Sequence, residues 1–163
     1  MSEKFDFDAF YERNWKYVYR LCFTYMKNAA DAEDCAEDVF VKVLNGGFVF
    51  EDETHERKWL AVTAGNHCKD KLRSRSRKPL DYLEDIAEPA ADEPDDHSDV
   101  LQAVLALPPK YKEVVWLYYY DGYRTDEIAK MLRCPHSTVR NRLRDARERL
   151  KKALGGDTYD RTR

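Results

Sequence analysis

A run of basic side chains near the C-terminus of this 163-residue chain has the composition of a nucleic-acid-binding surface. Residues 133–152 contain eight Lys and Arg side chains and two acids. The apolar residues among them recur at three- and four-residue spacing, which predicts a helix from about His136 to Leu154 with a basic outer face. Arg and Asn can form bidentate hydrogen bonds with guanine and adenine in the major groove. A salt-bridged surface helix is the alternative interpretation. The candidate base-contacting residues are Arg140, Asn141, Arg144 and Arg147.

A second basic run, residues 66–78, contains six Lys and Arg side chains and one acid. It lies at the end of a predicted helix over about 55–74, whose earlier turns carry Trp59 and Asn66. An indole can stack on unpaired bases, and a basic helix end can hold a phosphate chain. This combination predicts binding of single-stranded nucleic acid. The alternative is that Trp59 belongs to an ordinary apolar core and Asn66 to an ordinary surface.

An acidic helix is predicted over residues 32–44, where apolar side chains again follow helical spacing. Five acids lie between Asp31 and Asp38, at the N-terminal end of this helix. The helix dipole favours acids at this position, so a solvated acidic face is the alternative to a face that binds a basic partner.

The remaining elements are also predicted to be helical. Asp8 is expected to cap the first helix, and residues 28–31 are expected to end it before the acidic helix begins. Gly46-Gly47 is expected to end the acidic helix. In the C-terminal half, Thr125 is expected to cap a short helix that a tight turn, Arg133-Cys134-Pro135, separates from the basic helix. A helix, a tight turn and a basic helix are typical of a helix-turn-helix domain. The helices predicted in this half cover 100–107, 111–120, 126–132 and 136–154.

Composition indicates two small helical domains joined by a linker. Residues 79–100 contain nine acids and no Lys or Arg, and prolines interrupt the segment. Like charges extend such a segment and proline ends helices, so it predicts a flexible acidic linker. The predicted fold class is therefore all-α, and the predicted parts are 1–78, the linker 79–98, 99–155 and a tail, 156–163.

Composition also excludes several classes. Hydrophobic residues make up 43% and charged residues 36% of the chain, which is typical of a globular protein and not of a disordered one. Neither an apolar run of membrane-helix length nor a signal-peptide pattern is present, so a cytoplasmic protein without membrane insertion is expected. The four cysteines are far apart and form no ligand pattern. Reduced thiols, no metal and no cofactor are expected.

Taken together in their order along the chain, four segments resemble the extracytoplasmic-function (ECF) class of the sigma-70 family of bacterial sigma factors. Residues 31–40 (DAEDCAEDVF) are similar to region 2.2 of that family, and Trp59-Leu60 with residues 66–72 to regions 2.3 and 2.4. Residues 107–123 are similar to region 4.1, and residues 127–147 to region 4.2. The resemblance covers most of the chain. The sequences of these segments are most similar to those of family members from Gram-positive bacteria.

The resemblance implies a promoter-specificity subunit of RNA polymerase with no catalytic activity. It would direct core polymerase to promoters, capture one strand of the minus-10 element and recognise the minus-35 duplex. The implied partners are core RNA polymerase, promoter DNA and an unidentified anti-sigma factor, without any small-molecule substrate. The implied polymerase-binding residues are Asp31, Glu33, Asp34, Glu37 and Asp38. The implied minus-10 residues are Phe48, Phe50, Trp59, Asn66, Lys69, Arg73, Arg75 and Arg77. The implied minus-35 residues are Ser137, Thr138, Arg140, Asn141, Arg144 and Arg147.

Two of the positions that depart from the family pattern bear on the fold. Glu56 stands where an aromatic or aliphatic residue is common, three positions before the tryptophan. Arg133 replaces the frequent glycine of the helix-turn-helix turn, so it must tolerate a strained backbone.

Two other classes of protein remain as alternatives. A stand-alone DNA-binding regulator would need only the C-terminal half, and an enzyme would need a nucleophile, base or ligand pattern that the sequence does not contain.

Overall fold

The computed structural model describes residues 5–76 and 99–155, and every regular element in these two stretches is a helix. The predicted all-α class is therefore confirmed. The chain divides into two compact units, Met1–Glu93 and Pro94–Arg163. The predicted linker and tail lie outside the described residues, and so does Arg77. None of the described helices has the length and apolar character needed to cross a membrane.

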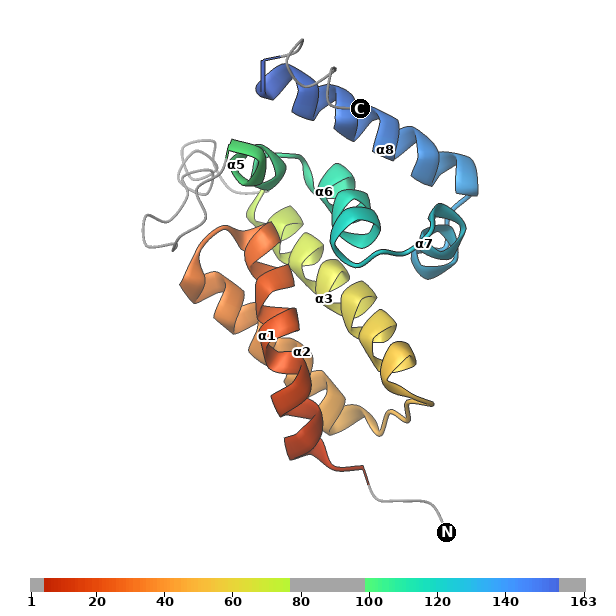
Figure 1. Cartoon of the computed structure of the whole chain (residues 1–163). Coiled ribbons are helices and arrows are strands. Elements are labelled where there is room, and N and C mark those ends of the chain that lie inside the picture. The colour runs from red at the N-terminus through yellow and green to blue at the C-terminus, as the bar shows by residue number, and fades with distance from the viewer. Residues whose placement is uncertain (1–4, 77–98, 156–163) are drawn as a thin grey trace. The chain divides into compact units, whose positions relative to one another are not determined.

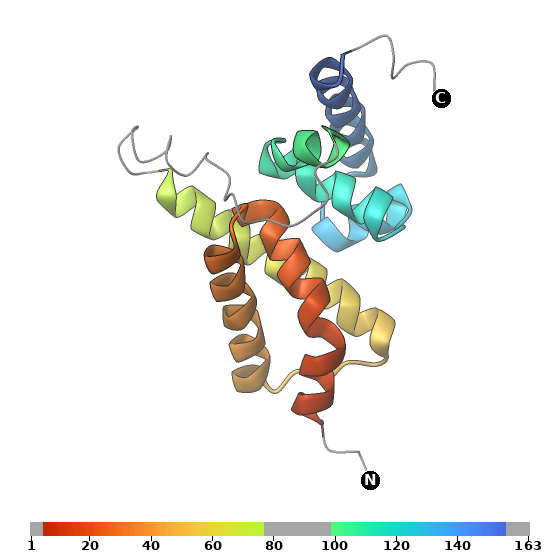
Figure 2. The same cartoon turned by 60° about the vertical axis from the view of Figure 1, so that its left-hand side comes forward.

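Among the described residues of the first unit there are three helices, and each of them packs against the other two (Figures 1 and 2). They are α1 (Phe7–Met26), α2 (Ala29–Gly46) and α3 (Glu53–Arg75). Apolar residues at helical spacing face inward, as the sequence pattern predicts. The buried core consists of Phe10, Val18, Leu21, Cys22, Tyr25, Met26, Ala32, Cys35, Ala36, Val39, Phe40, Val43, Leu60, Ala61, Ala64 and Cys68.

Side-chain caps determine where these helices begin, and they correct two expectations. Asp6, not Asp8, caps α1, because the Asp6 carboxylate accepts a hydrogen bond from the Ala9 amide at 3.2 Å. Asn28 caps α2 through a 2.9 Å bond from the Asp31 amide. The helix therefore begins at Ala29, three residues before the predicted start. Gly47 ends α2 in the left-handed conformation that glycine adopts without strain, as expected.

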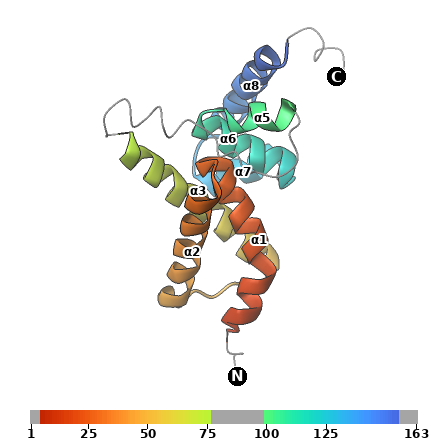
Figure 3. The same cartoon turned by 90° about the vertical axis from the view of Figure 1, so that its left-hand side faces the viewer.

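The described part of the second unit, residues 99–155, contains four α-helices and one π-helical turn. Figure 3 labels the four α-helices. Helix α8 packs against α5, α6 and α7, and the π-helical turn packs against α6 and α7. The elements are α5 (Asp99–Leu105), α6 (Pro109–Val115), η1 (Trp116–Tyr120), α7 (Thr125–Leu132) and α8 (His136–Ala153). The buried core consists of Val104, Leu107, Tyr111, Val114, Val115, Leu117, Ile128, Ala129, Val139, Leu143 and Ala146.

Two local features of this unit differ from or refine the sequence prediction. Arg124, not Thr125, is the cap of α7, and its amide donates to the Glu127 carboxylate at 2.9 Å. The turn before α8 places Arg133 at φ 56°, ψ 50°, the left-handed region. The strained position expected at Arg133 is therefore confirmed. The ammonium of buried Lys112 donates to the Leu105 carbonyl at 3.0 Å, which compensates a carbonyl at the C-terminal end of α5.

Candidate nucleic-acid and partner-binding surfaces

The outer face of α8 carries the residues predicted to contact duplex DNA. Ser137, Asn141 and Arg144 are exposed and lie four and three positions apart, so they share one side of the helix. Arg140 and Arg147 are exposed seven positions apart, which places them together on a flank of the same helix. Thr138, the sixth predicted residue, is half-buried. This arrangement leaves guanidinium and amide donors in solvent while Val139, Leu143 and Ala146 hold the helix to the unit.

A hydrogen bond joins the first turns of the two helices in the helix-turn-helix. The Thr125 hydroxyl lies 2.7 Å from Nε2 of His136. Because Thr125 begins α7 and His136 begins α8, this contact fixes the two helix N-termini beside each other. Helix N-termini are positions where backbone amides can bind phosphate.

The exposed face of α3 brings together four of the residues predicted to bind a single strand. Trp59, Asn66, Lys69 and Arg73 are spaced seven, three and four positions apart, so they follow one side of the helix. Asn66 and Arg73 are exposed, and Trp59 and Lys69 are half-buried. These four residues are called the strand face below. Arg73 carries an ion pair with Asp70 at 2.6 Å, three positions earlier on α3.

An aromatic cluster lies at the N-terminal end of the strand face. The rings of Phe48 and Phe50, from the segment between α2 and α3, lie 4.5 and 5.5 Å from the Trp59 ring. The Phe50 ring stacks on Phe10 of the core at 5.6 Å, so one side of the cluster is anchored. Val49, between the two phenylalanines, is 83% exposed. The structure therefore brings Phe48, Phe50 and Trp59 together, as the sequence interpretation requires.

The backbone beside this cluster is held by two hydrogen bonds. Asp52 caps α3 by accepting from the His55 amide at 2.8 Å, and the Glu51 amide donates to Nδ1 of His55 at 3.0 Å. These bonds give the segment between α2 and α3 a defined backbone, and a preformed backbone lowers the entropy cost of binding a ligand.

Arg75, by contrast, does not lie on the strand face. Together with His67 and Lys71 it occupies a second side of α3, at four-residue spacing, which packs against α2. The Arg75 guanidinium lies 2.9 Å from the Asp31 carboxylate. His67 and Lys71 lie 2.9 and 3.6 Å from Asp38. Two of the five predicted polymerase-binding acids are therefore engaged by α3 within the unit.

The contact with Arg75 changes the ionisation of Asp31. Burial favours the neutral carboxyl, but hydrogen bonds from Asn28 and Arg75, together with the charges of Arg75 and Lys71, outweigh burial. The pKa of Asp31 is therefore lower than that of an ordinary aspartate. The carboxylate stays ionised and holds Arg75 against α2.

The other three acids, Glu33, Asp34 and Glu37, are exposed and are called the acidic face below. Within the described residues no ion pair or hydrogen bond engages these carboxylates. Val41 is 50% exposed and lies four residues beyond Glu37 on α2, so an exposed apolar side chain borders the acidic face. Charged and apolar groups in this arrangement suit a basic protein partner.

A buried carboxylate joins α1 to α3 below the strand face. Glu56 is only 4% exposed, and it accepts two hydrogen bonds from Arg13, at 2.9 and 2.7 Å, and one from Asn14, at 2.9 Å. Burial alone would raise its pKa, but these bonds and the charges of Arg13 and Arg57 lower it below the ordinary glutamate value. Nothing in the sequence places Arg13 beside Glu56, 43 positions away. The glutamate at this position therefore binds an arginine on α1.

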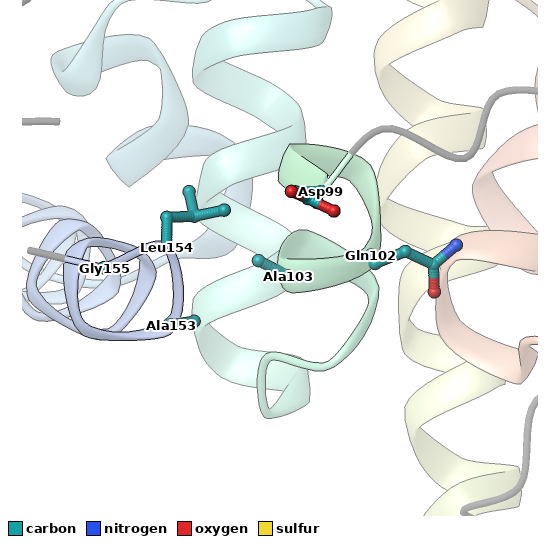
Figure 4. A pocket seen from close by; sticks show the side chains of 6 residues that line it. All are labelled: Asp99, Gln102, Ala103, Ala153, Leu154 and Gly155. Atoms are coloured by element: carbon teal, nitrogen blue, oxygen red, sulfur yellow. The ribbon is translucent and has the colours of Figure 1, made fainter. Parts of the chain in front are cut away.

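A pocket beside the C-terminal end of α8 does not qualify as a ligand site. Figure 4 shows its lining, which comes from α5 and from the end of α8. Its polar side chains are one carboxylate, Asp99, and one amide, Gln102, which do not form the convergent set that a ligand site requires. Among the described residues, no group of three His, Cys, Asp or Glu side chains could hold a metal ion. The complete lining is Asp99, Gln102, Ala103, Ala153, Leu154 and Gly155.

Comparison with known proteins gives the same division of the chain. Residues 10–78 match the family described as sigma-70 region 2, and residues 97–150 match sigma-70, region 4. The chain is 31% identical to the ECF RNA polymerase sigma factor SigW of Bacillus subtilis, over 84% of this chain and 82% of that protein. It is 28% identical to the ECF RNA polymerase sigma factor SigM of Mycobacterium tuberculosis, over 94% and 80%.

Two further comparisons extend the range of relatives. The RNA polymerase sigma-H factor of Pseudomonas aeruginosa is 27% identical, over 94% of this chain and 88% of that protein. Because relatives of similar identity come from Bacillus and Pseudomonas, the suggested likeness to Gram-positive members stays a prediction. Among solved structures, the sigma factor RpoE of Bartonella quintana, in complex with the anti-sigma factor NepR, has the same fold. The TM-score is 0.70 at 21% identity, over 93% of this chain and 98% of that one.

Proposed function

Since this chain belongs to the ECF sigma factors of the sigma-70 family, we propose that each of its three exposed surfaces has one role in promoter-specific initiation. These roles are binding of polymerase, binding of the minus-10 strand and recognition of the minus-35 duplex. Sigma factors bind core RNA polymerase and promoter DNA and are not enzymes. The observation that carries the proposal is the presence of three exposed surfaces on three different helices: the acidic face of α2, the strand face of α3 and the basic outer face of α8. A stand-alone regulator would need only the last of these.

The acidic face would bind the coiled coil formed by the clamp helices of the largest polymerase subunit. Glu33, Asp34 and Glu37 support this assignment because they are exposed and carry no ion pair among the described residues. Asp31 and Asp38 would contribute less, because Arg75 pairs with Asp31, and Lys71 and His67 contact Asp38. The acids facing polymerase therefore form a smaller set than the five that the sequence predicts.

The strand face would bind the non-template strand of the minus-10 element. Phe48, Phe50 and Trp59 offer aromatic surface for a base that has left the duplex, and Asn66, Lys69 and Arg73 would follow the strand beyond it. Removing a base from a duplex costs a few kcal/mol, and stacking on an aromatic ring offsets about 1–3 kcal/mol of this. Because Arg75 binds Asp31, its role would be to hold α3 on α2.

Replacement of Trp59 by leucine tests this surface. The leucine keeps an apolar contact with Phe48 but removes the aromatic ring, so the holoenzyme should bind a fork-junction promoter with unpaired minus-10 bases about 10-fold more weakly. Binding to a duplex that contains only the minus-35 element serves as the control and should not change. An equal loss on both DNAs would contradict the assignment, since it would indicate a general folding defect.

The outer face of α8 would recognise the minus-35 duplex from the major groove. Arg140 is exposed and carries no ion pair with a described residue, so its guanidinium is available to a base edge. Arg140→Ala should therefore cost about 1–3 kcal/mol of binding and relax the preference for one base pair. Selection of promoters from a randomised library by wild type and variant would measure both effects. Unchanged affinity and unchanged base preference would contradict the role of Arg140.

The remaining parts of the proposal concern organisation and regulation. The domains would be 1–78 for polymerase and minus-10 binding and 99–155 for minus-35 binding, joined by the acidic residues 79–98. A chain that acts with polymerase would lie in the cytoplasm. The Bartonella quintana relative was solved in complex with an anti-sigma factor, which supports the expectation that an anti-sigma factor also binds this chain.

A further inference from the structure

A tyrosine from the π-helical turn contacts one of the α8 arginines. Nε of Arg147 donates to the hydroxyl oxygen of Tyr119 at 2.8 Å. The guanidinium carbon also lies 5.7 Å from the centre of the Tyr119 ring and 5.9 Å from the centre of the Tyr118 ring. The two rings meet edge to face, with centroids 4.9 Å apart. Arg147 is therefore held by one hydrogen bond and two aromatic faces.

The local backbone explains why a tyrosine is available at this position. Residues Trp116–Tyr120 form a π-helical turn, which the Asp121 amide closes by donating to the Trp116 carbonyl at 3.0 Å. A π-turn adds a residue to the helical repeat and changes which side chains face a neighbouring helix. The contact with Arg147 is thus a consequence of η1, and an uninterrupted α-helix over 111–120, as predicted from the sequence, would orient this side chain differently.

The geometry of the bond leaves other donors available. An arginine bound through Nε keeps four N–H donors on its two terminal nitrogens, and an accepting tyrosine hydroxyl keeps its own O–H. No acceptor among the described residues engages these terminal donors of Arg147 or the Tyr119 hydrogen. Tyr119 is 54% exposed and Arg147 is also exposed. Two chemically different donor groups therefore point to solvent at one place on the flank of α8.

We infer that Tyr119 is a positioning residue that holds Arg147 for a contact with a backbone phosphate at the edge of the minus-35 element. The inference rests on the proposed role of α8 and adds a residue to it. Arg147 lies seven positions beyond Arg140, toward the C-terminal end of α8. Because a recognition helix contacts base edges with its N-terminal residues, Arg140 would reach a base and Arg147 the phosphates at the groove edge. Donors that surround an anionic oxygen suit phosphate, and phosphate contacts fix the register of a protein on DNA without reading a base.

The test uses holoenzyme and the promoter duplex that it selects from a randomised library. Tyr119→Phe removes one oxygen and keeps the ring, so it should weaken duplex binding about 3- to 10-fold, the range of a single hydrogen bond. Arg147→Lys keeps the charge but lacks the Nε donor and should cause a similar loss. In the Arg147→Lys background, Tyr119→Phe should have no further effect. The loss should also be equal for promoters that differ in their minus-35 bases.

A neighbouring tyrosine provides the matched control. Tyr120 is 52% exposed and stacks on Trp116 at 4.9 Å, so Tyr120→Phe removes the same atom without touching Arg147 and should leave binding unchanged. A Tyr119→Phe loss that persists in full in the Arg147→Lys background would overturn the inference, as would wild-type binding by Tyr119→Phe. If Arg140→Ala lowers binding while Tyr119→Phe does not, the role of α8 stands and the inference fails. If neither variant lowers binding, both fail.

Discussion

Replacing Glu33 and Glu37 by lysine is expected to abolish binding to core RNA polymerase and to leave the first unit folded. Both side chains are exposed on α2 and carry no ion pair among the described residues, so the substitutions break no contact that stabilises the fold. Close charge pairs across protein interfaces couple by about 1.5–7 kcal/mol, and reversal replaces attraction by repulsion. We therefore expect a loss of affinity of at least about 100-fold, measured by titration of labelled chain with core polymerase.

The control and the choice of positions follow from the structure. Glu12→Lys reverses another exposed acid, on α1, and should bind polymerase as wild type does. Asp38→Lys is a less specific variant, because it would remove the carboxylate that Lys71 and His67 contact, place a second ammonium beside Lys71 and loosen α2 from α3. Wild-type affinity in the Glu33→Lys, Glu37→Lys double variant would refute the polymerase-binding role of the acidic face.

Replacing Glu56 by alanine is expected to lower the free energy of unfolding by about 3 kcal/mol at neutral pH. The carboxylate is almost fully buried, and its removal leaves Arg13 and the buried amide of Asn14 without their shared acceptor. Removing one partner of a buried ion pair costs about 3–5 kcal/mol, and the Arg13 side chain, which is 38% exposed, recovers part of this through hydration. Urea unfolding of the full chain measures the change.

Because the pKa of Glu56 is lowered in the folded state, the free energy of unfolding should decrease as the pH falls into the acidic range. A carboxyl whose pKa is lower in the folded state stabilises the fold above its unfolded pKa of about 4.3. This stabilisation is lost as pH falls from there through the folded pKa, so wild type and Glu56→Ala should converge in stability in acid. Glu53→Ala is the matched control, because Glu53 is 81% exposed and lies 3.7 Å from the same arginine. Equal, small effects of both substitutions would show that burial of Glu56 contributes nothing.

The sequence was sufficient for features that depend on local periodicity. The spacing of Val139, Leu143 and Ala146 predicts both the burial of one side of α8 and the exposure of its arginines. The αL position of Arg133 was expected only from the family resemblance, because Arg133 replaces the frequent glycine of the turn. The two caps that were misplaced, at Asp6 and Arg124, lie one or two residues from the predicted ones. Asp6 and Asp8 both offer a carboxylate to the free amides at the start of α1, and sequence alone does not decide between them. At Arg124 the cap hydrogen bond has the opposite direction, from the Arg124 amide to the Glu127 carboxylate.

Contacts between distant segments could not be predicted in this way. Asp31 and Arg75 lie 44 positions apart, and both were assigned to external partners because each is charged and lies in a run of like charge. Their pairing depends on how α2 packs against α3, which periodicity restricts to a face but does not fix residue by residue. Periodicity likewise does not predict the contact between Tyr119 and Arg147. This contact also requires a π-helical turn, which no residue pattern in 116–120 predicts.

Run-off transcription by bacterial core RNA polymerase on a promoter library, with and without this chain, tests the central claim most directly. We expect initiation that depends on the chain, at promoters that share two sequence elements separated by a constant spacing. The Glu33→Lys, Glu37→Lys variant should give none of this initiation. Polymerase that neither binds the chain nor changes its start sites in its presence would contradict the proposed function and would favour a stand-alone DNA-binding regulator.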